Sequence, residues 1–160
     1  MIWQTSSTSS EDTERLGGLL GSQLTGGEVI ELRSDLGGGK TTFVRGLVRG
    51  TGSQDRVSSP TFTLSRIYKA GKFDIHHFDF YRLEAAGVLA DQLAEAVSNQ
   101  QVIVVEWAKI VENVLPDDRL TIEFTATAAG PDDRQITFLY PENYREIIAK
   151  LEAGWPELRP

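Results

Sequence analysis

The sequence predicts a single α/β domain, in which helices flank a mixed sheet with a parallel core and antiparallel hairpin strands. Residues 28–33 alternate as a half-buried strand does, and a glycine-rich loop then leads into apolar residues at helical spacing. A second run, at 101–107, is apolar enough for a buried strand, while turn residues at 70–71 and 129–132 divide two segments as hairpins are divided. Strands that alternate with helices are typical of α/β domains, and the hairpins make the sheet mixed.

The remaining elements follow from the same patterns. With 40% hydrophobic content, residues 1–160 can bury one core and are expected to form one domain, with a loose tail at 154–160. In chain order, we expect a helix at 10–24, a strand at 28–33, the helix after the glycine loop, strands at 61–68 and 72–80, a helix at 83–97 weakened by Gly87, a strand at 101–107, a short helix at 108–114, strands at 119–125 and 134–140, and a helix at 143–151.

Residues Ser34 to Thr41, Ser-Asp-Leu-Gly-Gly-Gly-Lys-Thr, are the most informative stretch of the chain. A strand, a glycine loop, Lys-Thr and a helix are the layout of a phosphate-binding loop, or P-loop. Glycines let backbone N–H groups converge at the positive end of the helix, Lys40 can reach the β- and γ-phosphates, and the Thr41 hydroxyl can bind Mg²⁺. Ser34 replaces the first glycine of the consensus and adds a Cβ where crowding is expected. The alternative is a glycine-rich turn before an ordinary helix.

Two acidic residues stand at the ends of expected strands. A P-loop enzyme needs a carboxylate at the end of a neighbouring buried strand to hold Mg²⁺ or its waters. Glu106 follows four aliphatic residues, 102–105, and Asp79 closes the first hairpin. Both are therefore candidates for a role in catalysis, and the alternative is that they cap helices or face solvent.

Other residues near these motifs have less specific signals. Thr61, in a Ser/Pro-rich segment between the P-loop helix and the next strand, is a candidate contact for Mg²⁺ or the γ-phosphate, or else belongs to a simple turn. His76 and His77 are adjacent, so in a strand they face opposite sides, and we expect both to be structural. Trp107 is expected to be a packing residue.

Composition narrows the class of protein. The chain has no cysteine, which excludes disulfides and thiolate metal sites. Its N-terminus lacks the pattern of a secretory signal, and its longest aliphatic run, 102–105, is too short to cross a bilayer, so we expect a cytoplasmic protein with no membrane contact. A formal net charge of −7 argues against a surface that binds nucleic acid unaided. If this protein acts in a process that involves RNA, we expect another protein to bind the RNA.

Five segments of the chain form a recognisable set in order and spacing: Ser34–Gly46, Ser59–Leu64 (Ser-Pro-Thr-Phe-Thr-Leu), His77–Leu83 (His-Phe-Asp-Phe-Tyr-Arg-Leu), Val104–Trp107 and Leu115–Asp117. Together they resemble the TsaE (YjeE) family, small bacterial P-loop ATPases required for the threonylcarbamoyl-adenosine modification of tRNA. This chain departs from the family pattern at Ser34, where the family has glycine, and at Ala108, where proline often follows Glu-Trp.

The resemblance implies an ATPase of low intrinsic activity that depends on Mg²⁺ and works with TsaD- and TsaB-type proteins, contacting tRNA only indirectly. Lys40, Asp79 and Glu106 would serve hydrolysis, with Thr41 and Glu106 holding Mg²⁺. Ser9 and Gly130 would lie near the adenine. The phosphates would be bound by Leu36, Gly37, Gly38, Gly39, Lys40 and Thr41, with Thr42 continuing the helix start and Thr61 nearby.

Two other classes of protein stay open at this point. A P-loop kinase for a small molecule would need an acceptor pocket and an arginine-rich lid, and the arginines of this chain are scattered. A nucleotide-gated binding module without turnover would use Glu106 and Asp79 only as structural residues. A GTPase is less expected, because the chain has no Asn-Lys-x-Asp motif to recognise guanine.

Overall fold

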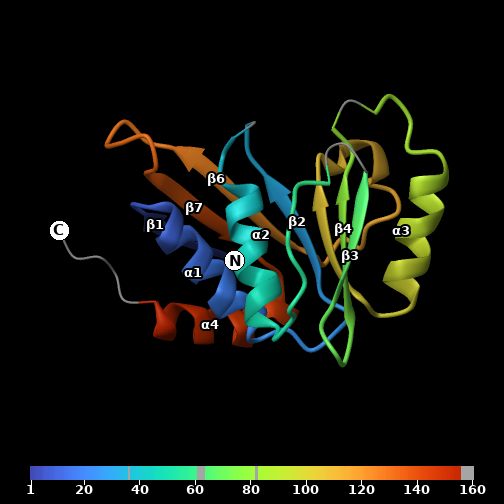
Figure 1. Ribbon diagram of the computed structural model, residues 1–160, viewed down its shortest axis with the longest axis horizontal. Helices are drawn as coiled ribbons and strands as arrows, with labels where there is room; N and C mark the ends of the chain where they lie inside the picture. Colours follow the sequence, from blue (N-terminus) through green and yellow to red (C-terminus); the bar gives the residue numbers. More distant parts are fainter. Residues whose placement is uncertain (36, 61–63, 82, 156–160) are drawn as a thin grey trace.

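The computed structural model describes residues 1–35, 37–60, 64–81 and 83–155. Within this part of the chain, one seven-stranded sheet has the strand order β1-β7-β6-β2-β5-β4-β3 (Figure 1). The elements are β1 (Ile2–Ser7), α1 (Ser10–Gly21), β2 (Val29–Arg33), α2 (Lys40–Gly50), β3 (Ser65–Lys69), β4 (Asp74–Asp79), α3 (Val88–Ser98), β5 (Val102–Glu106), the 3₁₀ helix η1 (Ala108–Val111), β6 (Leu120–Ala126), β7 (Arg134–Leu139), the 3₁₀ helix η2 (Glu142–Tyr144) and α4 (Arg145–Gly154).

The sheet is mixed, which confirms the predicted fold class. Strand β2 pairs in parallel with β5 and β6, and β4 pairs in parallel with β5. Antiparallel pairs extend this core on both sides, through β3 at one edge and through β7 and β1 at the other. The ends of β2, β5 and β4 therefore meet at one edge of the sheet, where ligands of open α/β sheets bind.

Strand β1 was missed by the sequence analysis. Its six residues, Ile-Trp-Gln-Thr-Ser-Ser, carry a weak strand signal, and the first five are exposed or half-buried. The strand forms because it pairs with β7 along its whole length and because Trp3 packs against Phe138, with ring centroids 4.9 Å apart. This pairing joins the two ends of the chain, so a local pattern does not reveal it.

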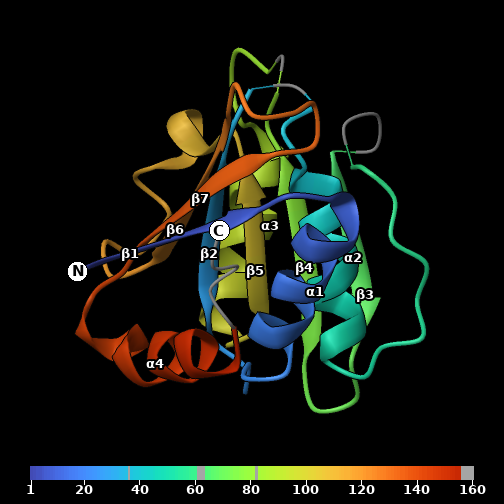
Figure 2. The ribbon, with the colours of Figure 1, turned by 90° about the vertical axis from the view of Figure 1, so that its left-hand side faces the viewer.

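Helices cover both faces of the sheet. Helices α1, α2 and α4 share one apolar core with one face, and α3 and η1 share a second core with the other. Figure 2 shows α1 and α2 packed together on one side of the strands. None of the helices among the described residues is long and apolar enough to span a membrane.

Glycines bring α1 and α2 unusually close. A Cβ added at Gly17 would collide with the carbonyl of Phe43, and one added at Gly46 would collide with the carbonyl of Glu14. Gly21 and Gly50 make the same kind of contact with the facing backbone. The start of α2, which follows the glycine loop, is therefore held firmly against α1.

Several predicted boundaries were wrong. Helix α3 begins at Val88 instead of 83, because Gly87 has a φ of 52° that a helix does not allow. Strand β3 begins at Ser65, and residues 61–63 of the expected strand lie outside the described part. Of the tail expected at 154–160, Gly154 is the last residue of α4, and Trp155 is buried with the Arg15 guanidinium 4.7 Å from its ring centroid. Residues 156–160 of the expected tail lie outside the described residues.

Candidate nucleotide site

The glycine loop joins β2 to α2 in the conformation that the P-loop motif predicts. Gly37 and Gly39 have φ values of 74° and 96°, in the left-handed region that favours glycine. Gly38 lies against the side chain of Ser34, so a Cβ there would have no room. Helix α2 has Gly39 at its N-cap, with no side-chain hydrogen bond there. These features suit an anion that takes the place of a capping side chain.

Lys40, the first residue of α2, points back toward the loop. Its Nζ donates to the Ser34 Oγ at 2.8 Å and to the carbonyls of Ser34 and Asp35 at 3.3 Å. Burial lowers the pKa of the Lys40 ammonium, and the charges of Glu106 and Asp79 act against this shift. The lysine is thus a charged donor in a mostly buried position, held by atoms that a phosphate group would replace.

The two strand-end acids lie next to each other. The parallel register of β4 and β5 pairs Asp79 with Glu106, and both side chains are buried. Glu106 Oε1 lies 3.9 Å from Lys40 Nζ, while Asp79 Oδ1 accepts the backbone N–H of Tyr81 at 2.8 Å. The structure therefore brings the lysine and both carboxylates to one point above the ends of the strands.

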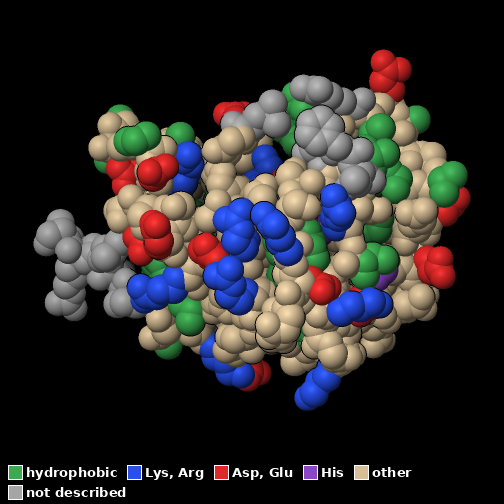
Figure 3. All heavy atoms as spheres, in the orientation of Figure 1, with side chains coloured by type: hydrophobic (Ala, Val, Ile, Leu, Met, Phe, Trp, Pro, Cys, Tyr) green, Lys and Arg blue, Asp and Glu red, His purple; other side chains and the backbone are tan. Residues whose placement is uncertain are grey.

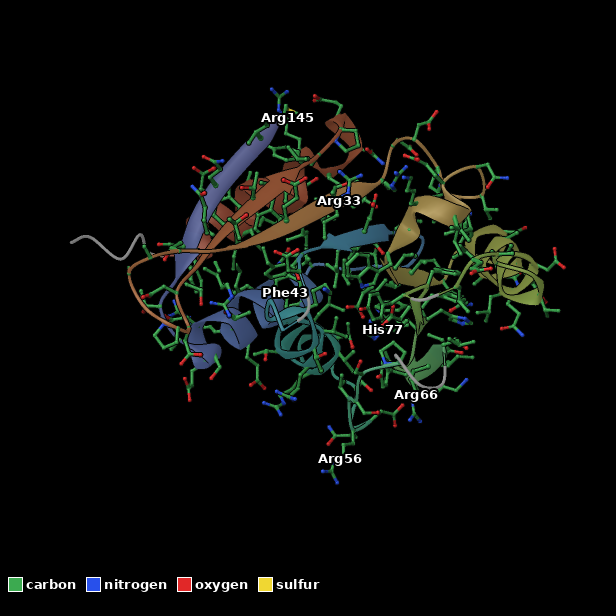
Figure 4. The ribbon with its side chains drawn as sticks, turned by 90° about the horizontal axis from the view of Figure 1, so that it is seen from above. Arg33, Phe43, Arg56, Arg66, His77 and Arg145 are labelled. Carbon is green, nitrogen blue, oxygen red and sulfur yellow. The ribbon has the colours of Figure 1, made fainter. Side chains whose placement is uncertain are left out.

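His77 contacts Glu106 directly. Its Nε2 lies 2.7 Å from Glu106 Oε2, and both residues are buried. His76 points to the other side of β4 and stacks near Phe78, as expected for adjacent residues of a strand. Figure 4 shows His77 among the side chains in the interior of the molecule. A structural role was expected for both histidines, but His77 also contacts a candidate residue of the site.

A pocket of about 250 Å³ joins most of these residues. Ser9 and Gly130 do not line it. Ser9 caps α1 through the Asp12 N–H, and Gly130 lies in the β6–β7 turn, so their proposed adenine contacts stay predictions. Leu36 and Thr61 lie outside the described residues. The residues that line the pocket are Gly37, Gly38, Gly39, Lys40, Thr41, Thr42, Ser59, Asp79, Glu106 and Trp107.

Trp107, expected to be a packing residue, makes such a contact at the pocket and not in the core. Its side chain is exposed at the pocket, its ring centroid lies 5.4 Å from Lys40 Nζ, and it packs against Tyr81 at 4.9 Å. Its φ of 56° is rare for a residue with a bulky side chain, and such strained backbone often marks functional sites. The sequence signal that could have placed Trp107 at the pocket is its position directly after Glu106, at the end of β5.

Arg134 contacts the glycine loop, although nothing in the sequence indicated a role for it at the site. From β7, its Nε donates to the carbonyl of Gly38 at 3.2 Å, and its Nη2 reaches the carbonyl of Gly37 at 3.5 Å. It thereby supports the glycine loop from the side of the second hairpin. No local pattern relates this arginine to residues almost 100 positions earlier in the chain.

The residues present fit Mg²⁺ bound together with phosphate. Among the described residues, no group of three or more His, Asp or Glu side chains converges as a metal site. Thr41, Asp79 and Glu106 line the pocket, however, and offer the hydroxyl and carboxylate oxygens that Mg²⁺ prefers. Mg²⁺ keeps several waters and takes further ligands from phosphates, so a full protein cage is not required.

The net charge of −7 hides an uneven distribution. Between residues 41 and 72 the sequence has six basic residues and one acidic residue. Figure 3 shows lysine and arginine side chains gathered over α2 and toward β3, on the face that includes these residues. Arg56 and Arg66 are labelled toward the lower margin of the molecule in Figure 4, and neither lines the pocket.

Comparisons with known proteins point to one family. The family model described as threonylcarbamoyl adenosine biosynthesis protein TsaE matches residues 7–136. The tRNA threonylcarbamoyladenosine biosynthesis protein TsaE of Bacillus subtilis is 37% identical over 148 residues, which cover 92% of this chain and 90% of that protein. The protein of the same name from Treponema pallidum is 40% identical over 132 residues, covering 82% and 96%. The crystal structure of Bacillus subtilis YdiB matches with a TM-score of 0.76 and 30% identity over 96% of both chains.

Proposed function

Because the chain belongs to the TsaE family and hence to the biosynthesis of threonylcarbamoyladenosine in tRNA, we propose that it is a Mg²⁺-dependent ATPase of that pathway. The observation that carries the proposal is the convergence of a glycine loop, Lys40 and two buried carboxylates in one pocket. As implied by the family resemblance, its partners would be TsaD- and TsaB-type proteins in the cytoplasm, with tRNA contacted only through them.

Each part of the pocket has a distinct task in this proposal. The N–H groups of the loop and the Lys40 ammonium bind the β- and γ-phosphates and offset their charge. Thr41 and Glu106 hold Mg²⁺, which supplies further positive charge to the phosphates when bound. Asp79 orients the attacking water or a water on the metal. Catalysis then rests on positioning and charge, with little covalent work for the protein.

The open side of the pocket supports low activity in the isolated chain. Trp107 is exposed there, and Ser59, which also lines the pocket, belongs to the segment between α2 and β3. Water reaches a site of this kind freely, and a partner that covers it would strengthen the electrostatic contacts inside. This supports hydrolysis that a partner complex completes.

The geometry does not favour a small-molecule kinase. A kinase lid would place arginines on the transferring phosphate, and none of the described residues that line the pocket is an arginine. Arg56 and Arg66 are not among these lining residues. The alternative would require an acceptor pocket beside the loop and phosphorylation of a small hydroxyl compound.

The test is ATP hydrolysis by the purified chain, alone and with TsaD- and TsaB-type proteins and tRNA. We expect weak activity alone, a rise with the partners, and loss of activity and of tight ATP binding in Lys40→Ala. Asp79→Asn should keep ATP in the site while slowing turnover in the complex, whereas Glu106→Gln should weaken Mg²⁺-dependent ATP binding as well as slow turnover. ATP binding by Lys40→Ala equal to that of wild type would refute the P-loop assignment. Unchanged turnover in both carboxylate variants would instead indicate a binding module.

A further inference from the structure

The contact between His77 and Glu106 has a defined direction. A carboxylate only accepts hydrogen bonds, so the 2.7 Å contact requires a proton on His77 Nε2. His77 Nδ1 is buried and has no hydrogen-bond partner among the described residues. The bond from Nε2 to Glu106 is therefore the one that the described residues give this imidazole. It holds one oxygen of the carboxylate in place.

The two oxygens of Glu106 have different surroundings. Oε2 is held by His77, whereas Oε1 lies 3.9 Å from Lys40 Nζ. A hydrogen-bonded pair of ammonium and carboxylate has a separation of about 2.7–2.9 Å, so Glu106 and Lys40 stop short of closing onto each other. Both groups are buried, where such a pair attracts strongly. Bonds hold the two groups apart from both sides: Lys40 Nζ is bonded to Ser34 and Asp35, and the carboxylate of Glu106 is bonded to His77.

The sheet explains why a histidine in this position reaches Glu106. The register of β4 and β5 pairs Asp79 with Glu106 and His77 with Val104, so His77 lies diagonal to Glu106 on the same face. Position 77 is thus below the pocket rather than in it. From there a side chain can bind one carboxylate oxygen and leave the other free toward the loop.

We propose that His77 is a positioning residue that fixes Glu106 as a ligand for the Mg²⁺–nucleotide complex and keeps it from pairing with Lys40. This inference rests on the proposed function. Without His77, Glu106 would turn to Lys40, which would remove the carboxylate from Mg²⁺ and the ammonium from the phosphates at once. Residues that orient metal ligands in this way typically change metal affinity by about 10- to 100-fold when removed.

The experiment compares His77→Gln, which keeps an N–H donor near the position of Nε2, with His77→Leu, which lacks one. Binding of a fluorescent ATP analogue to the full chain is measured with Mg²⁺ and with EDTA, after thermal melting has shown that each variant is folded. We expect His77→Leu to weaken binding with Mg²⁺ by about 10- to 100-fold and binding in EDTA much less. His77→Gln should recover a clear part of the loss.

A double-mutant cycle with Glu106→Gln separates this role from a merely structural one. If His77 acts through Glu106, His77→Leu should add little to the loss already caused by Glu106→Gln. Equal losses with Mg²⁺ and EDTA, additive losses in the double variant, or Mg²⁺–ATP binding by His77→Leu like that of wild type would each overturn the inference. The last result leaves the proposed function standing, because wild type still binds. Failure of wild type to bind Mg²⁺–ATP would overturn both.

Discussion

Ser34 stands where the P-loop consensus has glycine, and the structure predicts its effect on nucleotide affinity. Its Oγ donates to the carbonyl of Asp35 at 2.8 Å and accepts from Lys40 Nζ at the same distance. The serine thus helps to hold the lysine against the loop, in a position that competes with phosphate. Replacing Ser34 with alanine or glycine should therefore release Lys40 and raise the affinity for ATP.

The size of the effect follows from the bonds that remain. A hydrogen bond to a charged group contributes about 1.5–3 kcal/mol. The two longer bonds from Lys40 to the loop carbonyls, at 3.3 Å, stay and take up part of the loss. A net gain of about 1 kcal/mol is left, which lowers the dissociation constant for ATP about fivefold. The assay is calorimetric titration of ATP with Mg²⁺ into wild type, Ser34→Ala and Ser34→Gly.

The two variants also separate the effect of the Ser34 hydroxyl on ATP affinity from the effect of its Cβ, which lies against Gly38. Equal gains in both assign the effect to the hydroxyl, whereas a gain in Ser34→Gly alone assigns it to crowding of the loop. In a Lys40→Ala background, Ser34→Ala should have no effect. A clear loss of affinity in both single variants would refute the reasoning, because the serine would then contact the nucleotide itself.

Three further predictions concern stability and a spectroscopic signal. Gly17→Ala should lower the free energy of unfolding in urea by about 1–3 kcal/mol through its clash with α2, whereas Gly18→Ala, with its Cβ at an ordinary 3.6 Å, should be neutral or stabilising. Tyr144→Phe should cost about 1–3 kcal/mol, since the Tyr144 hydroxyl bonds both the N–H and the carbonyl of Val29. Burial raises the pKa of Tyr144 to about 12, so its proton stabilises the fold fully below pH 10, and this contribution is lost as the pH rises from 10 to 12. ATP binding should change the fluorescence of Trp107, because it moves the nearby lysine, and Trp107→Phe should remove most of the change.

Each of these predictions has a result that would contradict it. Equal stability of Gly17→Ala and Gly18→Ala would show that the helices can move apart at no cost. A Tyr144→Phe protein as stable as wild type, or with the same loss of stability between pH 10 and 12, would exclude the proposed bonds of the phenol. A fluorescence change that persists in Trp107→Phe would assign the signal to another tryptophan.

Elements that depend on local physics could be predicted from the residues alone. The glycine loop requires φ values that favour glycine, the run at 102–105 is too apolar for any place but a buried strand, and the acids at positions 79 and 106 close strands that parallel pairing brings side by side. The P-loop, the mixed sheet and the two candidate carboxylates were therefore predictable. The residue types and their spacing were enough for each of them.

Features that depend on contacts between distant residues could be seen only in the folded chain. Folding alone paired β1 with β7, placed Arg134 behind the glycine loop and gathered basic side chains on one face of an acidic chain (Figure 3). It also set the diagonal that joins His77 to Glu106 across two strands. The physical reason is the same in each case, because register and packing bring together residues far apart in sequence, and local patterns carry no information about such partners.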